Sequence, residues 1–442
     1  MVLYPIHPRR SASGGFGRTA GCFSMRVERG RTECGQQPSR AVGRRGLMVA
    51  AAGVGLTWAG SGWGMGSPTP VRLPPTGVFA KHVVPAIPDP VVAGTPVLAS
   101  TSAPLVPQRV SHPASHGAAA LRDWATFKQR FTNGDGRVID TGNGGVSHSE
   151  GQGWGLLFAV AFDDEASFDS ILGWTRRNLR RPGDALHAWR YVPGAPQPVA
   201  DWNNATDADL FIAAALWRAS WRWGRPELAE QAGAIARDVL GLAVRDVGGR
   251  VLLLPGADGF TDSASVTVNP SYYAFPLLDE MAALVPSARW AAVRSDGLQL
   301  LADARFGRWR LPPDWLRVDR QSGALSPHPH WPARFSYDAI RVPLWLSWAN
   351  DKTTVIGQSF DSYWTSSRVV PAAWIDLNTD ISATYPASPG MVAVARTATA
   401  LSQCGKKALE PVGIPALSAS PDYYSAALIL LSRLAWLETR ET

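Results

Sequence analysis

Apolar residues recur three and four positions apart through most of the chain after residue 120, the spacing that gathers them on one face of an α-helix. The segments with this spacing are 121–131, 150–162, 166–180, 206–223, 227–242, 271–284, 289–303, 338–349, 390–403 and 422–437. Strict apolar and polar alternation, which would indicate strands, is scarce. About ten to twelve helices joined by loops of very uneven length favour a large all-α toroid over a four-helix bundle.

Helix-capping and helix-breaking residues mark three of the boundaries. Asp164 stands before one apolar run, Pro226 opens a second, and Pro286 follows the end of a third. These residues predict where one helix ends and two others begin.

The first 66 residues, 1–66, are predicted to be an export leader. Arg44 and Arg45 precede the apolar stretch 46–56, which is typical of a signal segment and short for a membrane span. The adjacent arginines fit an ordinary positive start as well as twin-arginine export. We expect cleavage of the leader and a periplasmic or secreted mature protein with no membrane span.

The next segment, 67–118, is rich in Pro, Val, Ala, Ser and Thr and has almost no charge and no sustained period. This composition is typical of a disordered linker. The remaining residues, 119–442, are predicted to form one helical domain.

Charge and cysteine content exclude several classes of function. The formal net charge is +7, and residues 1–66 account for it with nine arginines against two glutamates. The rest of the chain is therefore neutral, which argues against a nucleic-acid partner. Only Cys404 lies beyond the leader, so neither a disulfide framework nor a cysteine metal site is expected. His148 has no partner at metal-ligand spacing and is interpreted as a polar loop residue, so no metal or organic cofactor is expected.

Tryptophan is frequent, with 19 in the chain and only Trp58 and Trp63 in the leader. Several of the others stand beside Gly, Pro, Asp or Asn in predicted loops: Trp202, Trp309, Trp315 and Trp331. Any one of them is most simply a packing residue. As a group they indicate surfaces on which sugar rings could stack, because a pyranose presents an apolar patch of C–H groups.

Glu150 is the first candidate for acid chemistry. It stands between small residues at the head of the apolar run 154–162, whose side chains should desolvate the carboxyl and keep it protonated. Gly151 and Gly153 should let a substrate approach the backbone closely. The alternative is a carboxylate placed in the first turn of a helix, where the helix dipole stabilises it.

Asp338 is the second candidate, far along the chain. Tyr337 precedes it, and Arg341 follows three residues later on the same side of a helix, where it should hold the carboxylate ionised. The alternative is a helix N-cap. Hydrolysis of an acetal needs two acids in different environments, and these two meet that need.

A third acidic motif lies at Asp207 and Asp209. Two residues that are two positions apart cannot face the same way on a helix. We assign Asp207 to a cleft and Asp209 to a structural role.

Several motifs together resemble glycoside hydrolase family 8. They are S-E-G-Q-G-W-G-L from Ser149, A-W-R from Ala188, A-T-D-A-D from Ala205, N-P-S-Y from Asn269, F-S-Y-D-A-I-R-V-P from Phe335 and D-Y-Y from Asp422. Their common order extends over nearly all of the helical domain, which would then be the catalytic domain 119–442. The resemblance implies an (α/α)6 barrel and inversion of the anomeric configuration.

The same resemblance implies roles for individual residues. Glu150 would be the general acid, Asp338 the base that activates water, and Asp207 a ligand of the sugar at the cleavage point. The other implied substrate-binding or supporting residues are Trp154, Trp189, Tyr272, Tyr337, Arg341 and Tyr424.

The motifs are most similar to those of family 8 endoglucanases associated with bacterial cellulose synthesis. The expected protein is therefore an exported monomeric endo-β-1,4-glucanase acting on cellulose, with the cellulose synthase machinery as a possible partner. Xylan, mixed-linkage glucan and chitosan stay open as substrates, because the same acids serve any β-linked pyranoside. A non-catalytic glucan-binding component of a cellulose export machine is the alternative from another class.

Overall fold

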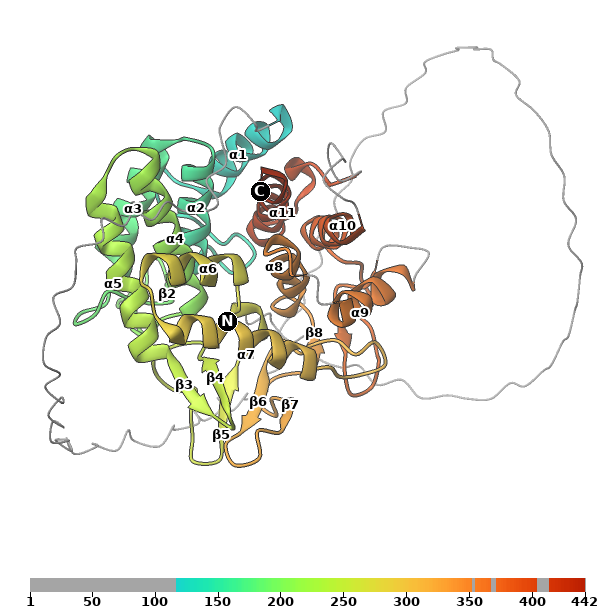
Figure 1. Cartoon of the computed structure of the whole chain (residues 1–442). Helices are drawn as coiled ribbons and strands as arrows, with labels where there is room; N and C mark the ends of the chain where they lie inside the picture. Colours follow the sequence, from blue (N-terminus) through green and yellow to red (C-terminus); the bar gives the residue numbers. More distant parts are fainter. Residues whose placement is uncertain (1–116, 352–353, 367–370, 404–412, 442) are drawn as a thin grey trace, which may run out of the picture. The chain divides into compact units, whose positions relative to one another are not determined.

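A computed structural model describes residues 117–351, 354–366, 371–403 and 413–441 (Figure 1). The predicted leader lies outside the described residues, and so does the predicted linker apart from its last two residues. What the sequence predicts for these two segments stays a prediction.

The described residues hold eleven α-helices. They are α1 (Ala118–Phe131), α2 (Ser149–Ala161), α3 (Glu165–Leu179), α4 (Thr206–Arg222), α5 (Pro226–Ala243), α6 (Phe275–Leu284), α7 (Ala288–Asp303), α8 (Val342–Trp348), α9 (Thr354–Thr365), α10 (Pro389–Gln403) and α11 (Tyr423–Glu441). All but α9 fall on segments that the apolar spacing predicts. The missed helix α9 still buries Ile356, Phe360 and Tyr363, which are spaced four and three apart. Its Ser, Thr and Gly content hid that spacing.

Six of the helices form a closed inner ring. In order of contact these are α2, α4, α6, α8, α10 and α11, and α11 returns to α2 (Figure 1). The other helices pack outside this ring, with α3 on α2, α5 on α4, α7 on α6, α9 on α10 and α1 on α11. Arg433 of α11 also pairs with Asp123 of α1 at 2.5 Å, which joins the last helix to the first. The structure is an (α/α)6 barrel, and the predicted all-α fold is confirmed.

The inner position of α2 and α4 follows from their composition. Every residue of α2 except Glu150 is buried, and so is every residue of α4 from Thr206 to Ser220. A helix that is apolar on all sides must be covered on all sides. Outer helices such as α5 instead keep one exposed polar face.

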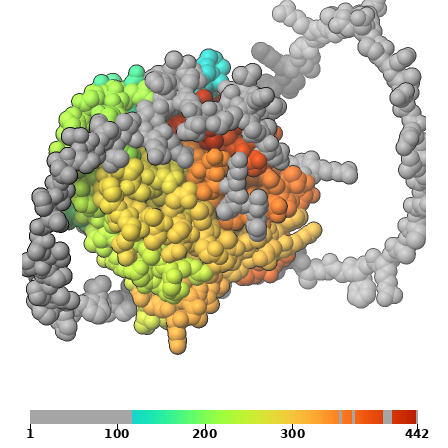
Figure 2. Space-filling view, in the orientation of Figure 1, coloured from blue at the N-terminus to red at the C-terminus, as the bar shows by residue number. Residues whose placement is uncertain are grey.

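Nine short strands lie in the connections: β1 (Ser147–His148), β2 (Arg190–Tyr191), β3 (Val244–Val247), β4 (Arg250–Leu253), β5 (Ser265–Val268), β6 (Leu316–Asp319), β7 (Leu325–Pro327), β8 (Arg334–Phe335) and β9 (Ile375–Asp376). They pair antiparallel as β1 with β2, β3 with β4, β5 with β6 and β7, and β8 with β9. The connections that carry β3 to β7 project from the helical body at the bottom of Figure 2. Alternation of apolar and polar residues cannot reveal strands that are only two to four residues long.

The three predicted helix boundaries agree with the structure. The Asp164 side chain accepts a hydrogen bond from the Ser167 amide at 3.1 Å and so caps α3. Pro226 is the first residue of α5, and α6 ends two residues before Pro286.

Two inner helices begin later than predicted. A 3-10 turn, η2 (Pro270–Tyr272), precedes α6, and another, η3 (Ala339–Arg341), precedes α8. Proline at the second position of both α6 and α8 fits a helix start there, because that position needs no amide donor. The predicted site motifs therefore lie on turns before the inner helices.

A buried ion triad joins four inner helices. Arg218 of α4 pairs with Glu280 of α6 at 2.5 Å and with Glu438 of α11 at 2.7 Å. The indole N–H of Trp348 on α8 donates to Glu438 at 3.0 Å. These bonds satisfy charges that would be costly to bury alone.

Candidate active site

Three carboxylates from distant parts of the chain meet at one arginine. Glu150 lies in the first turn of α2, Asp207 in the first turn of α4, and Asp338 directly before η3. Arg341 Nη1 forms an ion pair with Glu150 and lies 3.5 Å from Asp207 Oδ2, while its Nη2 lies 3.0 Å from Asp338 Oδ1. We call Glu150, Asp207, Asp338 and Arg341 the acid cluster.

The acid cluster is open to solvent only in part. The side chains of Glu150 and Asp338 are 18% and 23% exposed, whereas those of Asp207 and Arg341 are 2% exposed. Arg341 Nη2 also donates a hydrogen bond to Ser271 Oγ at 2.7 Å, which helps to fix the guanidinium. A reactant that enters from solvent therefore meets Glu150 and Asp338 first.

Burial raises the proton affinity of two of these acids. Desolvation is the main cause that raises the pKa of Asp207 to about 8, and the charges of Asp338 and Asp209 add to it. Desolvation likewise raises the pKa of Asp338, although the adjoining side chains of Asn269 and Trp315 oppose it.

Asp207 and Asp209 differ in the contacts of their carboxyl groups. Asp209 accepts hydrogen bonds from the His187 amide at 3.0 Å and from Asn204 Nδ2 at 3.0 Å, and it lies 2.9 Å from the His187 ring. Asp207 Oδ1 accepts from the Ala208 amide, while its Oδ2 faces Arg341 without a hydrogen bond among the described residues. Asp209 therefore holds a loop, and Asp207 keeps an unused acceptor within the acid cluster.

The predicted aromatic residues surround the acid cluster at different depths. Tyr272 is buried, with its ring 6.0 Å from the Arg341 guanidinium carbon. Tyr337 is half-buried, and Tyr424 donates its hydroxyl proton to the Tyr337 carbonyl. Trp189 is half-buried and donates its indole N–H to Asp201 at 2.8 Å.

Trp154 contradicts its predicted role in substrate binding. Its side chain is fully buried and packs against Phe211 and Tyr423, with Arg341 5.8 Å from the ring. A ring without exposed surface cannot receive a sugar. Trp154 supports the underside of Arg341 instead.

The two glycines beside Glu150 also differ from their predicted purpose. A Cβ on Gly151 would lie 2.6 Å from the Tyr423 hydroxyl, and one on Gly153 would lie 2.8 Å from the Phe211 Cβ. Both glycines are buried in α2, and because they have no side chain a neighbouring helix can pack closely against each of them. No room is left there for a substrate. The predicted approach of substrate to this backbone is wrong, because the inner ring already occupies that space.

His148 does not lie in a loop, contrary to its interpretation as a polar loop residue. It lies in β1, is buried, and stacks on Trp189 with ring centroids 6.0 Å apart. Desolvation is the main cause that lowers its pKa to about 3, so the ring is neutral. His148 thus forms a backing for Trp189.

Sequence reasoning missed Asp314 and did not single out Ser271. Asp314 lies in a connection before β6 and bonds to the turn that carries Asp338, as described below. Ser271 was seen only as part of the N-P-S-Y motif. Neither residue shows its role by local spacing, because each acts across the fold.

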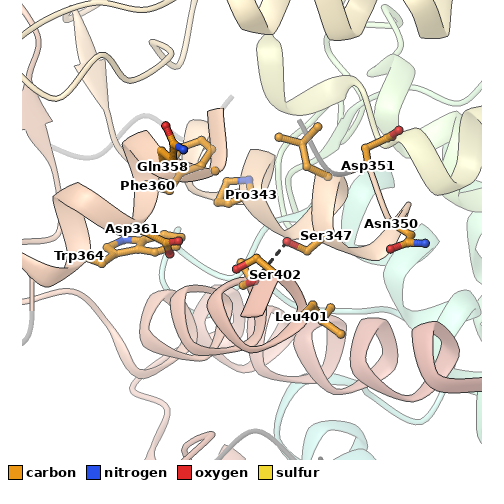
Figure 3. Close-up of a pocket in the computed structure, with 13 residues that line it drawn as sticks. Pro343, Ser347, Asn350, Asp351, Gln358, Phe360, Asp361, Trp364, Leu401 and Ser402 are labelled. Carbon is orange, nitrogen blue, oxygen red and sulfur yellow. Dashed lines mark hydrogen bonds between the residues drawn. The ribbon is translucent and has the colours of Figure 1, made fainter. Parts of the chain in front are cut away.

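The pocket in Figure 3 lies away from these residues. It has a volume of about 300 Å³ and is lined by α8, α9 and α10, including Phe360, Asp361 and Trp364. None of its lining residues belongs to the acid cluster. Its two acids are bonded elsewhere, Asp351 to Arg294 and Asp361 to Thr399. Acetal hydrolysis needs two acids that a substrate can reach, so we place the candidate site at the acid cluster.

The described residues lack both a grouping of metal ligands and a membrane-spanning helix. Within them, no three His, Cys, Asp or Glu side chains are grouped as a metal ion would require. None of the described helices is both long and apolar enough to cross a bilayer.

We expect the substitution Asp207→Asn to stabilise the protein more at pH 8 than at pH 5. The pKa of Asp207 rises from an ordinary 3.8 to about 8 on folding, so its contribution to stability is full at low pH and is lost as the pH rises through 8. Asparagine does not ionise and avoids this loss. The stability difference from wild type should grow by about 1 kcal/mol or more between the two pH values. Urea unfolding at both values measures it, and an equal difference at both would contradict a raised pKa.

The chain is similar to known hydrolases over most of its length. The model of glycosyl hydrolases family 8 matches residues 103–438. A probable endoglucanase of Novacetimonas hansenii is 46% identical over 349 residues, which cover 78% of this chain and 97% of that protein. An endoglucanase of Cellulomonas uda is 38% identical, over 67% of this chain and 80% of that protein.

A solved structure shares the fold as well as the sequence. It is the endo-β-1,4-glucanase CMCax from Acetobacter xylinum, with a TM-score of 0.68 and 46% identity, covering 72% of this chain and 98% of that one. The family match takes in all six inner helices and the acid cluster. The protein is therefore a hydrolase that belongs to glycosyl hydrolases family 8.

Proposed function

We propose that this protein is an exported endo-β-1,4-glucanase that cleaves internal bonds of cellulose chains with inversion. The observation that carries the proposal is the meeting of Glu150 and Asp338 at Arg341, each partly open to solvent and each on a different inner helix start. The substrate follows from the two similar proteins named as endoglucanases, one of them 46% identical over almost its whole length.

In the proposed reaction Glu150 and Asp338 act once each. Glu150 gives its proton to the glycosidic oxygen as the bond from that oxygen to the anomeric carbon breaks. Asp338 takes a proton from a water molecule, whose oxygen bonds to the opposite side of the same carbon. A water molecule needs room between the acids, so we predict carboxyl groups roughly 6.5 to 9.5 Å apart, and a separation near 5 Å would favour a retaining mechanism.

Arg341 must change partners for this reaction. An ion pair with Arg341 requires an ionised Glu150, whereas a general acid must hold a proton. We propose that a bound glucan displaces the guanidinium from Glu150 and leaves it with Asp338 and Ser271. Asp207, whose Oδ2 has an unused acceptor site, is then free to bind a sugar hydroxyl.

The substrate is tested by comparing polymers. The purified protein should lower the viscosity of carboxymethylcellulose quickly and release reducing sugar from it faster than from xylan, mixed-linkage glucan or chitosan. Preference for another polymer would replace cellulose as the substrate. No activity on any of them would favour the non-catalytic glucan-binding alternative.

Export, a monomeric state and a link to cellulose synthesis belong to the same proposal. The leader composition supports export, and N-terminal sequencing of the protein from the periplasm or medium tests it. Deletion of the gene tests the link, because a trimming role predicts altered cellulose fibres, while a purely degradative role leaves them unchanged.

We propose that Tyr385 binds the glucan beyond the cleavage point. The residue is 48% exposed, and its hydroxyl lies 3.2 Å from the Tyr337 hydroxyl and accepts a hydrogen bond from the Trp374 indole at 3.1 Å. It lines a cavity of about 450 Å³ together with Trp309 and Tyr363. Since Tyr337 adjoins Asp338, a glucan chain crossing the acid cluster can continue onto this ring.

We expect Tyr385→Ala to raise KM for cellohexaose about fivefold, since stacking on one aromatic ring contributes roughly 1 kcal/mol. KM for the shortest substrate that is cleaved should change less than twofold. Ile381→Ala, which removes an exposed side chain from the same connection, is the control. An equal change for long and short substrates would remove Tyr385 from the glucan path.

A further inference from the structure

The turn that carries Asp338 is capped by a different aspartate. Asp338 occupies the N-cap position of η3, yet its side chain makes no capping hydrogen bond. The amide of Ala339, the first residue of η3, donates instead to Asp314 Oδ1 at 2.8 Å. The Ser336 amide donates to the same oxygen at 3.0 Å, and the Ser336 hydroxyl donates to Asp314 Oδ2.

Asp314 is itself fixed to the strand that leads into this turn. Its amide donates to the carbonyl of Arg334 in β8 at 2.7 Å. The segment around Asp314 and residues 334–339 are therefore joined by backbone and side-chain bonds on both sides of Asp338. A shift of this turn would have to break several of these bonds together.

The hydrogen bonds of this turn leave the Asp338 side chain free to point away from it. An aspartate at an N-cap position normally turns its side chain back onto the first free amides of its own helix. The first amide of η3, that of Ala339, is already bonded to Asp314, and the amides of Ile340 and Arg341 donate to the carbonyls of Ser336 and Asp338. The Asp338 side chain therefore has no free amide to cap. Its carboxyl instead contacts Arg341 at 3.0 Å and adjoins Asn269 and Trp315.

We propose that Asp314 is a positioning residue for Asp338: its bonds to Ser336 and Ala339 hold the turn on both sides of Asp338 and thereby keep the base pointed toward the substrate. This inference rests on the proposed function of Asp338 as the base. Asp314 does not touch the substrate and acts only through the turn.

The two carboxyls also interact through their charges. Burial is the main cause that raises the pKa of Asp314 to about 7, and the charge of Asp338 adds to it. The other charged or titratable groups that face the pair are Arg341, Asp207, Tyr272 and, through Arg341, Glu150. With its pKa raised in this way, Asp314 is mostly protonated below neutral pH and carries little charge there, so its replacement by asparagine should leave the pKa of Asp338 unchanged.

Two substitutions separate the cap from the charge. Asp314→Ala removes the acceptor, so kcat on carboxymethylcellulose should fall by about 100-fold with KM within about twofold. Asp314→Asn keeps an oxygen for the two amides and removes the charge. It should recover most of kcat and leave the acidic limb of kcat/KM where it lies in wild type.

A matched control is available at Asp262. It makes the same set of bonds, to the amides of Ala264 and Ser265 and to the Ser265 hydroxyl, in a turn before β5. Asp262→Ala should leave kcat within about twofold. An equal loss in Asp262→Ala and Asp314→Ala would overturn the proposal, and so would an Asp314→Ala variant as active as wild type.

A second measurement does not depend on activity. Carboxyl carbon NMR of protein with labelled aspartate, with the Asp338 signal assigned by its absence in Asp338→Asn, follows the titration of Asp338 directly. Asp314→Ala should move the midpoint of Asp338, because the carboxyl loses its fixed place beside Arg341, whereas Asp314→Asn should leave it unchanged. An unchanged midpoint in Asp314→Ala overturns the inference. If wild type cleaves no glucan, the proposed function fails while this titration still decides the structural coupling.

Discussion

Glu150→Gln is expected to lower kcat on carboxymethylcellulose by about 1,000-fold or more while cellopentaose still binds with nearly wild-type affinity. Glutamine fills the same space but cannot give a proton to the glycosidic oxygen, and protonation of a poor leaving group is a large part of this catalysis. Reducing-sugar release measures the rate, and isothermal titration calorimetry measures binding.

Glu165→Gln is the matched control for Glu150, because Glu165 also lies in the first turn of a helix. If Glu150 acts only by stabilising the helix start, both substitutions should cost similar stability and neither should abolish activity. Substantial hydrolysis by Glu150→Gln would remove Glu150 from the acid role and favour that structural interpretation.

Asp338→Asn is expected to reduce kcat by a similar factor and to leave KM within about threefold. Asparagine cannot take a proton from water, and its position at Arg341 Nη2 can be kept by the amide oxygen. In wild type, proton NMR of fresh cello-oligosaccharide products should show the α-anomer first, as inversion of a β-bond requires. Early β-anomer would refute inversion, and Asp338→Asn activity close to that of an Asp319→Asn control would refute the role as base.

Much of the fold could be predicted because the inner helices differ so strongly from the rest. The segment from Ser149 to Ala161 is apolar on all sides, and Glu150 is its one residue that is not buried. A single acid in such a helix is conspicuous in sequence alone. The predicted positions of ten helices followed from the same contrast between buried and exposed faces.

The parts that sequence could not reveal depend on contacts across the fold. Asp314 is separated from Ser336 and Ala339 by 22 and 25 residues, and no local period links them. The burial of Trp154 and the tight fit of Gly151 against Tyr423 likewise arise only when α11 returns to α2. The sequence motifs located the three acids. Only the tertiary contacts show which of their neighbours are exposed and which are buried.

The closed ring also has a consequence for the newly made chain. Arg218 and Glu438 are 220 residues apart, and Asp123 and Arg433 are 310 apart, so the bonds that shut the barrel form only after α11 has left the ribosome. Until then α2 and α4, which are covered on every side in the folded protein, lack one of their covering neighbours. Their apolar side chains then stay exposed, which makes the unfinished chain prone to aggregation.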